Sequence, residues 1–315
     1  MNTPIGAAVV RPRVLSWSRT VPRELVHRVS VAEVLLTDVV RVAERRFVAA
    51  ACWPRSHPTF PVGGPAVHDP LMVVETLRQL GIYIALRHLG VAADTRMLIG
   101  DLHFGVLSRL QPRVRGGATD VTCRVRITRL YTSPDDAVTG VRLRAEYSAG
   151  GVVFAGAGGS ARFLSPGRYA AVRGPSADSP PPCPRAGALR PDPSVLGVAH
   201  PRDVLIAVVG PEGGGGREAR VDPADHHHPF FFDHASDHVP GTVLLEAARQ
   251  ATALVSGGEL LRLTGARLAV PRFTEYAPAA RVVCVPHHRT SVFRFEQGGE
   301  CGAFGVLRYH SLDRV

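Results

Sequence analysis

Two blocks of the sequence carry the same chemistry-bearing residues at the same spacing. His57-Pro58-Thr59-Phe60 is followed by Glu75 and Arg78-Gln79, and His228-Pro229-Phe230-Phe231 is followed by Glu246 and Arg249-Gln250. In both blocks 18 positions separate the histidine from the glutamate, and one offset of 171 relates the blocks. Such agreement at a single offset indicates an internal duplication, with one potentially reactive set in each copy.

The histidine and the glutamate of each block suit proton transfer. A neutral imidazole, such as that of His57 or His228, can take a proton from a hydroxyl nucleophile. A carboxyl group one or two turns into an apolar helix is costly to bury, and partial burial raises its pKa toward the useful range. We therefore predict that His57, His228, Glu75 and Glu246 are the catalytic residues.

Structural roles for the same residues stay open from the residues alone. Glu75–Arg78 and Glu246–Arg249 are i,i+3 neighbours, and an exposed pair of this kind contributes only about 0.2–0.5 kcal/mol. The two histidines could equally be polar loop residues at strand ends.

The residues around each glutamate suit substrate binding. Arg78 and Arg249 could hold a phosphate, because a planar guanidinium binds phosphate through paired hydrogen bonds. Gln79 and Gln250 could bond a substrate carbonyl or satisfy buried backbone, and the second role is slightly favoured. Gly241 lies at the start of the second predicted helix, whose free amides could polarise a carbonyl.

Each glutamate lies in a helical pattern that β-like stretches follow. Apolar residues recur with helical spacing after Pro70 and after Pro240, where a first turn tolerates proline. The stretches are Met97–Leu110, Val121–Tyr131, Val141–Tyr147 and Val152–Phe163 in the first copy, and Leu263–Tyr276, Arg281–Val285, Ser291–Glu296 and Ala303–Tyr309 in the second. Their alternation predicts half-exposed antiparallel strands, so we expect an α+β fold with one long helix against a sheet in each half.

The predicted organisation is two domains with a joint between them. Residues 1–20 form an N-terminal extension, 21–165 the first domain, 166–194 a linker and 195–315 the second domain. The linker contains eight prolines and no periodicity, which is typical of a semi-rigid connection. Gly213–Gly216 predicts a hairpin tip.

Composition excludes several protein classes. With 315 residues and 45% hydrophobic content, the chain can bury a core, so disorder throughout is excluded. Five scattered cysteines without a C-x-x-C pair exclude a disulfide scaffold and indicate reduced thiols in a cytoplasmic protein. No segment approaches the length of a membrane span, and no signal-peptide cleavage site is evident.

The net charge of +10 does not by itself indicate nucleic-acid binding. All 37 basic residues are dispersed arginines, and aromatic residues that could stack on bases make up only 6%. We expect no nucleic-acid partner. Anionic small molecules or an acidic carrier protein fit this diffuse charge equally well.

One histidine-rich segment has the composition of a metal site. Residues 225–238 hold five histidines and three aspartates. The first copy has only His57, His68 and Asp69 in the matching stretch, so the cluster is not part of the repeated set. We predict a solvated loop and no metal.

The motifs resemble known families. The segment Asp237–Gln250 resembles the central helix of β-hydroxyacyl-carrier-protein dehydratases, which carry a His-Phe-Pro element, then Pro-Gly, then Glu-Ala and a glutamine. Both blocks, their duplication and the proline-rich joint more closely resemble the A-factor biosynthesis (AfsA-type) family, from about Val21 onward. The resemblance implies a tandem hotdog fold, in which a curved antiparallel sheet wraps a long central helix in each half.

This resemblance also implies a function. Members act in γ-butyrolactone or butenolide signal biosynthesis as acyltransferases, without a cofactor. They transfer a β-ketoacyl group from a thioester, on acyl carrier protein or coenzyme A, to a hydroxyl of dihydroxyacetone phosphate. In hotdog dehydratases the histidine of one half faces the glutamate of the other, which implies His57 with Glu246 and His228 with Glu75. The acyl chain would enter the apolar space between the halves.

Three questions stay open at this point. Asp69-Pro70-Leu71 stands where the second copy has Val239-Pro240-Gly241, so the halves need not be equally active. A hotdog thioesterase or hydroxyacyl dehydratase is an alternative, as is a non-catalytic acyl- or lactone-binding regulator. Two joined hotdogs already supply the usual dimer, so a monomer and a homodimer are both compatible with the sequence.

Overall fold

The computed structural model describes residues 14–55, 57, 67–114, 116–178, 188–210, 218–234 and 236–310. The predicted hairpin tip at Gly213–Gly216 and most of the N-terminal extension lie outside these residues. The same is true of Pro58 and Phe60 in the first block.

The chain folds as two halves with the same order of elements. The first half contains η1 (Arg23–Val26), η2 (Val31–Glu33), β1 (Leu36–Ala43), β2 (Arg46–Trp53), α1 (Leu71–His88), β3 (Arg96–Val106), β4 (Thr119–Thr132), β5 (Val138–Ala149) and β6 (Val152–Leu164). The second half contains α3 (Pro193–Leu196), η4 (Pro201–Asp203), β7 (Ile206–Val209), β8 (Glu218–Val221), α4 (Gly241–Val255), β9 (Leu263–Ala269), β10 (Arg281–His287), β11 (Thr290–Gln297) and β12 (Glu300–Tyr309). Every element of one half therefore has a counterpart in the other.

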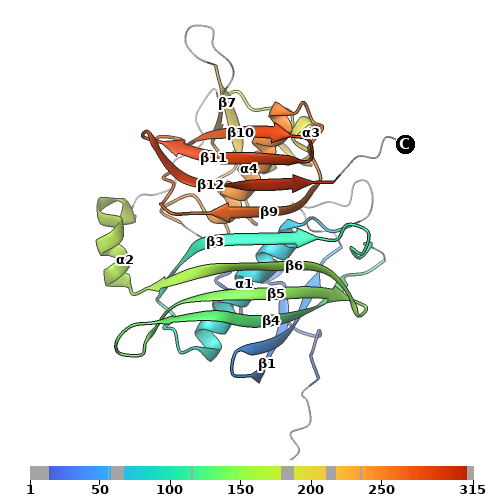
Figure 1. Cartoon of the computed structure of the whole chain (residues 1–315), viewed down its shortest axis with the longest axis vertical. Helices are drawn as coiled ribbons and strands as arrows, with labels where there is room; N and C mark the ends of the chain where they lie inside the picture. Colours follow the sequence, from blue (N-terminus) through green and yellow to red (C-terminus); the bar gives the residue numbers. More distant parts are fainter. Residues whose placement is uncertain are drawn as a thin grey trace, which may run out of the picture.

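All the strands form one antiparallel sheet. Their order is β1-β2-β4-β5-β6-β3-β9-β12-β11-β10-β8-β7, which reads as the same six-strand order from each edge inward. The halves join where β3 pairs with β9, with Phe104 opposite Ala266. Figure 1 shows this sheet with α1 behind the strands of the first half and α4 behind those of the second. The architecture is the expected α+β tandem hotdog.

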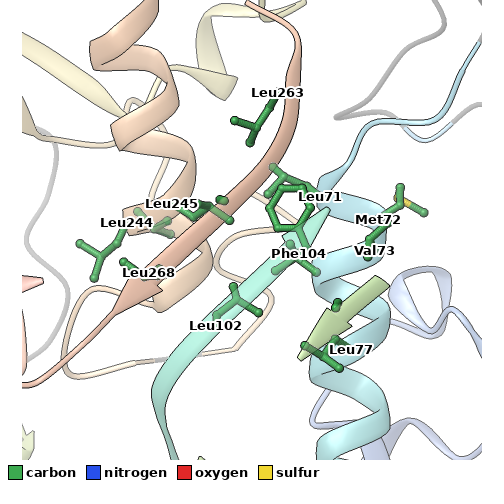
Figure 2. Close-up of a cluster of buried hydrophobic side chains, with 14 of the residues drawn as sticks. Leu71, Met72, Val73, Leu77, Leu102, Phe104, Leu244, Leu245, Leu263 and Leu268 are labelled. Atoms are coloured by element: carbon green, nitrogen blue, oxygen red, sulfur yellow. The ribbon is translucent and has the colours of Figure 1, made fainter. Parts of the chain in front are cut away.

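The core continues from one half into the other. Leu71 and Leu77 on α1, Leu102 and Phe104 on β3, and Leu244 on α4 are all buried. Figure 2 shows these side chains gathered between the two helices and the paired strands β3 and β9. Because the apolar surface of each helix is covered partly by the other half, the two halves share one core.

The predicted linker contains ordered structure that its lack of periodicity did not reveal. Residues 166–178 form α2 (Pro166–Arg173) and η3 (Gly174–Asp178), beside the junction of the halves in Figure 1. Arg173 is buried, with 2.8 Å from its Nε to Asp237 and 2.6 Å from its Nη1 to Glu275. This part of the joint is therefore anchored to the second half by ion pairs. None of the described helices is long and apolar enough to cross a membrane.

Strands β3 and β6 pack closely beside the junction, and a substitution on β6 tests how closely. A methyl group at Gly159 of β6 would overlap the carbonyl oxygen of Asp101 on β3. At Gly156, on the same strand, the nearest atom would be 3.8 Å away, which is ordinary contact. We predict that Gly159→Ala lowers the free energy of unfolding by about 1–3 kcal/mol. The control Gly156→Ala should stay within about 0.5 kcal/mol of the parent in urea unfolding. Equal effects of the two substitutions would contradict the close approach.

Candidate active site

The glutamate of each block is buried and paired with the arginine of the next turn. Glu75 and Glu246 are 1% and 4% exposed. Arg78 Nε lies 2.9 Å from one oxygen of Glu75, and Arg249 Nε lies 2.8 Å from one oxygen of Glu246. The predicted i,i+3 pairs therefore exist, but inside the protein, where an unpaired charge would be far more costly than on a surface.

The glutamine of each block binds the backbone before the first strand of its half. Gln79 Oε1 accepts from the Leu35 N–H at 2.9 Å, and its Nε2 donates to Glu33 O at 2.8 Å and to Glu75 at 2.7 Å. Gln250 makes the matching bonds to Leu205 N, Asp203 O and Glu246. Both amides are thus occupied by the protein and hold the central helix against the preceding turn.

Each repeated histidine pairs with a carboxylate of its own half. His57 Nε2 lies 3.2 Å from Glu33, and His228 Nε2 lies 3.0 Å from Asp203. His228 is fully buried, and its Nδ1 accepts from the Phe230 N–H at 3.2 Å. The ring of His228 therefore carries its proton on Nε2 and shapes the turn that follows it.

The two carboxylates, Glu33 and Asp203, were missed by sequence reasoning. They precede their histidines by 24 and 25 positions, but differ in type and in offset. A comparison of the two halves of the sequence would have found them if it had treated Asp and Glu as equivalent and had allowed a gap of one residue.

The loops of the two histidines meet at Phe230. The His57 and Phe230 ring centroids are 5.5 Å apart, and Arg28 Nη1 donates to Phe230 O at 2.9 Å. Among the described residues, no direct hydrogen bond joins His228 to Glu75, because Arg28 lies between their loops and binds Glu75 itself. The expected pairing of His228 with Glu75 is therefore indirect.

Arg28 makes the environment of Glu75 different from that of Glu246. Its side chain is 3% exposed, with Nη2 2.9 Å from one carboxylate oxygen of Glu75 and Nε 3.1 Å from the other. In the second half Val198 occupies the corresponding position, because Val198 follows Gly197 at the end of α3 as Arg28 follows His27 at the end of η1. Burial alone would raise the pKa of Glu75, but the charges of Arg28 and Arg78 lower it to about 2. Glu75 is therefore ionised at every physiological pH.

Asp69 is the group that approaches Glu246 from the first half. Its Oδ1 accepts from the Leu71 N–H at 2.8 Å at the start of α1. Burial and the negative charge of Glu246 raise the pKa of Asp69 to about 6, against opposing effects of the Leu71 N–H, Arg249 and His57. Asp69 of the first half therefore lies close to the Glu246–Arg249 pair of the second half and to His57. The sequence signal for Asp69 was its departure from the repeat.

Two further predicted residues are placed by the structure. Gly241 is the first residue of α4, and a methyl group there would lie 3.3 Å from the Cδ1 of Ile99 on β3. Arg249 Nη1 donates to Leu196 O at 2.8 Å, so its guanidinium is engaged on both sides by protein groups. In the histidine-rich segment and elsewhere in the described ranges, no group of three or more His, Cys, Asp or Glu could hold a metal.

The space between the two helices is filled by side chains. Leu71, Leu245 and Leu263 meet there, as Figure 2 shows, and each is at most 7% exposed. An acyl chain that follows the predicted path between the helices would therefore meet these leucine side chains.

Comparison with known proteins identifies the family. A model described as the A-factor biosynthesis hotdog domain, AfsA, matches residues 11–165 and 187–271. The chain belongs to the AfsA family.

Its relatives include enzymes of one name. A 2-oxo-3-(phosphooxy)propyl 3-oxoalkanoate synthase of Streptomyces virginiae is 37% identical over 274 residues, which cover 81% of this chain and 84% of that protein. The synthase of the same name from Streptomyces coelicolor is 33% identical over 247 residues, which cover 75% of this chain and 73% of that protein. Among solved structures, an acyl-ACP thioesterase from Bacteroides thetaiotaomicron has a TM-score of 0.49 at 9% identity, covering 84% of this chain and 98% of that one.

The buried cluster around Glu75 predicts a large effect on stability. In Glu75→Gln, Arg28 and Arg78 lose the negative charge that compensates their burial. We expect the free energy of unfolding to fall by about 3–5 kcal/mol, measured by urea unfolding. Glu44→Gln is the matched control, because the side chain of Glu44 is 82% exposed and its ion pair with Arg45 spans 3.6 Å. A change in Glu75→Gln as small as that of the control would contradict the proposed charge balance.

Proposed function

We propose that this protein is an acyltransferase that makes 2-oxo-3-(phosphooxy)propyl 3-oxoalkanoate. A hydroxyl oxygen of dihydroxyacetone phosphate attacks the carbonyl carbon of a 3-oxoacyl thioester. The carbon–sulfur bond breaks, the hydroxyl proton leaves and a thiol is released. Membership of the AfsA family and the name shared by its relatives support this reaction.

The observation that carries the chemistry is the position of Asp69 at the start of α1, where its carboxyl group is within reach of the charges of Glu246, Arg249 and His57. A general base works best when its pKa lies just below the working pH, and the pKa of Asp69, about 6, meets that condition. Asp69 is therefore the group that takes the proton of the acceptor hydroxyl. Glu246, held by Arg249 and Gln250, supplies the negative charge that raises the pKa of Asp69.

The other predicted catalytic residues receive supporting roles. His57, paired with Glu33, lies near Asp69 and orients that end of the site. His228 and Glu75 are positioning residues, because both are buried and bound to protein groups on their polar atoms. Gly241 brings the first amides of α4 to the junction, where they stabilise the oxyanion of the tetrahedral intermediate.

Acyl carrier protein or coenzyme A carries the acyl thioester in this proposal.

The four described cysteines, Cys52, Cys123, Cys284 and Cys301, are free thiols, which supports a reducing cytoplasmic setting.

The test is a product assay. Purified protein is mixed with a 3-oxoacyl thioester, with and without dihydroxyacetone phosphate, and the products are read by mass spectrometry. We expect a phosphorylated ester and one equivalent of thiol only when the triose is present. Free 3-oxo acid in both reactions would instead indicate a thioesterase, and an unchanged thioester would indicate a binding protein.

If Asp69 is the general base, kcat/KM should depend on its ionisation. Because only the ionised carboxylate accepts a proton, kcat/KM should rise with pH through about 6 and level off above it. Asp69→Asn should lose about 10²–10⁴-fold in kcat but keep its melting temperature, because asparagine can still accept from the Leu71 N–H.

A second variant separates Asp69 from other titrating groups. In Glu246→Gln the rise should move to lower pH, because the neighbouring negative charge is gone. A rise that persists at the same pH in Asp69→Asn would show that another group is the base.

A further inference from the structure

The two carboxylate sites have opposite surroundings. Around Glu75 lie Arg28 and Arg78, whereas around Glu246 lie Arg249 and the acidic side chain of Asp69. Asp233, 3.9 Å from Arg28, balances the second cation beside Glu75, whereas one cation and two acids lie together at Glu246. An anionic ligand is therefore opposed more strongly beside Glu246 than beside Glu75.

His27 adds an unusual feature to the Glu75 side. It caps η1 in a left-handed conformation with φ of 49°, which few residues other than glycine adopt. Gly197 stands at the corresponding cap of the second half, with φ of 64°. The first half therefore places an imidazole, at a cost in backbone strain, where the second half has no side chain.

One hydrogen bond and two charge effects place His27 close to cationic groups. Arg78 Nη2 donates to the carbonyl of Val26 at 3.3 Å, directly before His27 in the chain. The positive charges of Arg78 and Arg96, after the larger effect of burial, lower the pKa of His27 to about 4. His27 is thus a neutral, half-buried ring beside two cations.

The second half completes this surface. Asp233 accepts from the Val29 N–H at 2.6 Å and from the Ser30 N–H at 3.1 Å, which docks the chain after Phe230 onto the loop that follows His27. Its neighbour His234 keeps part of its surface exposed, and partial burial, followed by the charges of Arg78 and Arg28, lowers the pKa of His234 to about 4. His27 and His234 therefore approach Arg78 from different halves.

We propose that His27, Arg78 and His234 bind the phosphate of the triose acceptor, with Arg28 supplying charge behind them. This inference rests on the proposed function and names its acceptor site. Arg78 Nη1 has no hydrogen-bond partner within the described part of the chain, so it can donate to a phosphate oxygen. The two neutral imidazoles can each donate one further N–H. Arg249, the second predicted phosphate ligand, has its guanidinium engaged by Glu246 and Leu196 instead.

The ring of Phe230 lies between this site and His57. Phe230 touches Arg28 on one side and His57 on the other, with 5.4 Å from the Arg28 guanidinium to the ring centroid. Phosphate bound next to Arg78 would place the rest of the triose on the Arg28 side of Phe230, and His57 contacts the same ring. Binding of the anion and proton transfer are thus divided between neighbouring groups.

The test compares acceptors with and without the phosphate. Dihydroxyacetone phosphate and dihydroxyacetone are each offered as the acceptor to the parent protein, to His27→Asn and to Arg78→Gln. Asparagine suits the left-handed backbone at position 27, so His27→Asn removes the imidazole without adding strain. His287→Asn, at an exposed position on β10, is the matched control.

We expect KM for dihydroxyacetone phosphate to rise about 10- to 100-fold in both site variants, as for loss of a hydrogen bond to a charged group. In His27→Asn, activity with dihydroxyacetone and KM for the thioester should match those of the parent and of His287→Asn. Melting temperatures show whether each variant is folded, and His27→Asn remains informative if Arg78→Gln is unstable.

An equal loss with both acceptors, or no loss in either variant, would overturn the phosphate site. Neither outcome would contradict the proposed function, because the parent protein would still transfer the acyl group to dihydroxyacetone phosphate. A parent protein that forms no ester with dihydroxyacetone phosphate would overturn the proposed function itself.

Discussion

The burial of a carboxylate on each central helix is the constraint on which this structure depends. An ionised carboxyl group inside a protein has to be compensated by opposite charge and hydrogen bonds. Arg78 and Gln79 serve Glu75, and Arg249 and Gln250 serve Glu246. Because each glutamine also holds the turn before the first strand of its half, compensating the charge positions the helix, the turn and the histidine loop together.

The two halves keep this arrangement and differ in what completes it. Arg28 closes the Glu75 side with a second cation, and Asp69 approaches the Glu246 side with a second acid. Arg28 lowers the pKa of Glu75, whereas burial and the negative charge of Glu246 raise the pKa of Asp69. A duplicated fold can in this way assign anion binding to one side of Phe230 and proton transfer to the other.

Repetition made much of the fold and part of the site predictable. Identities at one offset located both central helices, and alternating patterns located strands such as β4 and β5 close to their observed bounds. The same method could not find Arg28 or His27, because their counterparts are Val198 and Gly197 and a search for identities ignores differences. Nor could it find the partners of the histidines, since pairs such as His228–Asp203 depend on tertiary packing across 25 residues.

The most direct test of the central claim is a titration of both carboxyl groups in one protein. Side-chain carboxyl ¹³C shifts of Asp69 and Glu75 would be followed by NMR from pH 3 to pH 8. Asp69 should titrate near pH 6, and Glu75, with a pKa of about 2, should stay ionised throughout that range. If Asp69 and Glu75 both titrated near the ordinary value of a free carboxyl group, the opposite electrostatic roles of the two halves would be wrong.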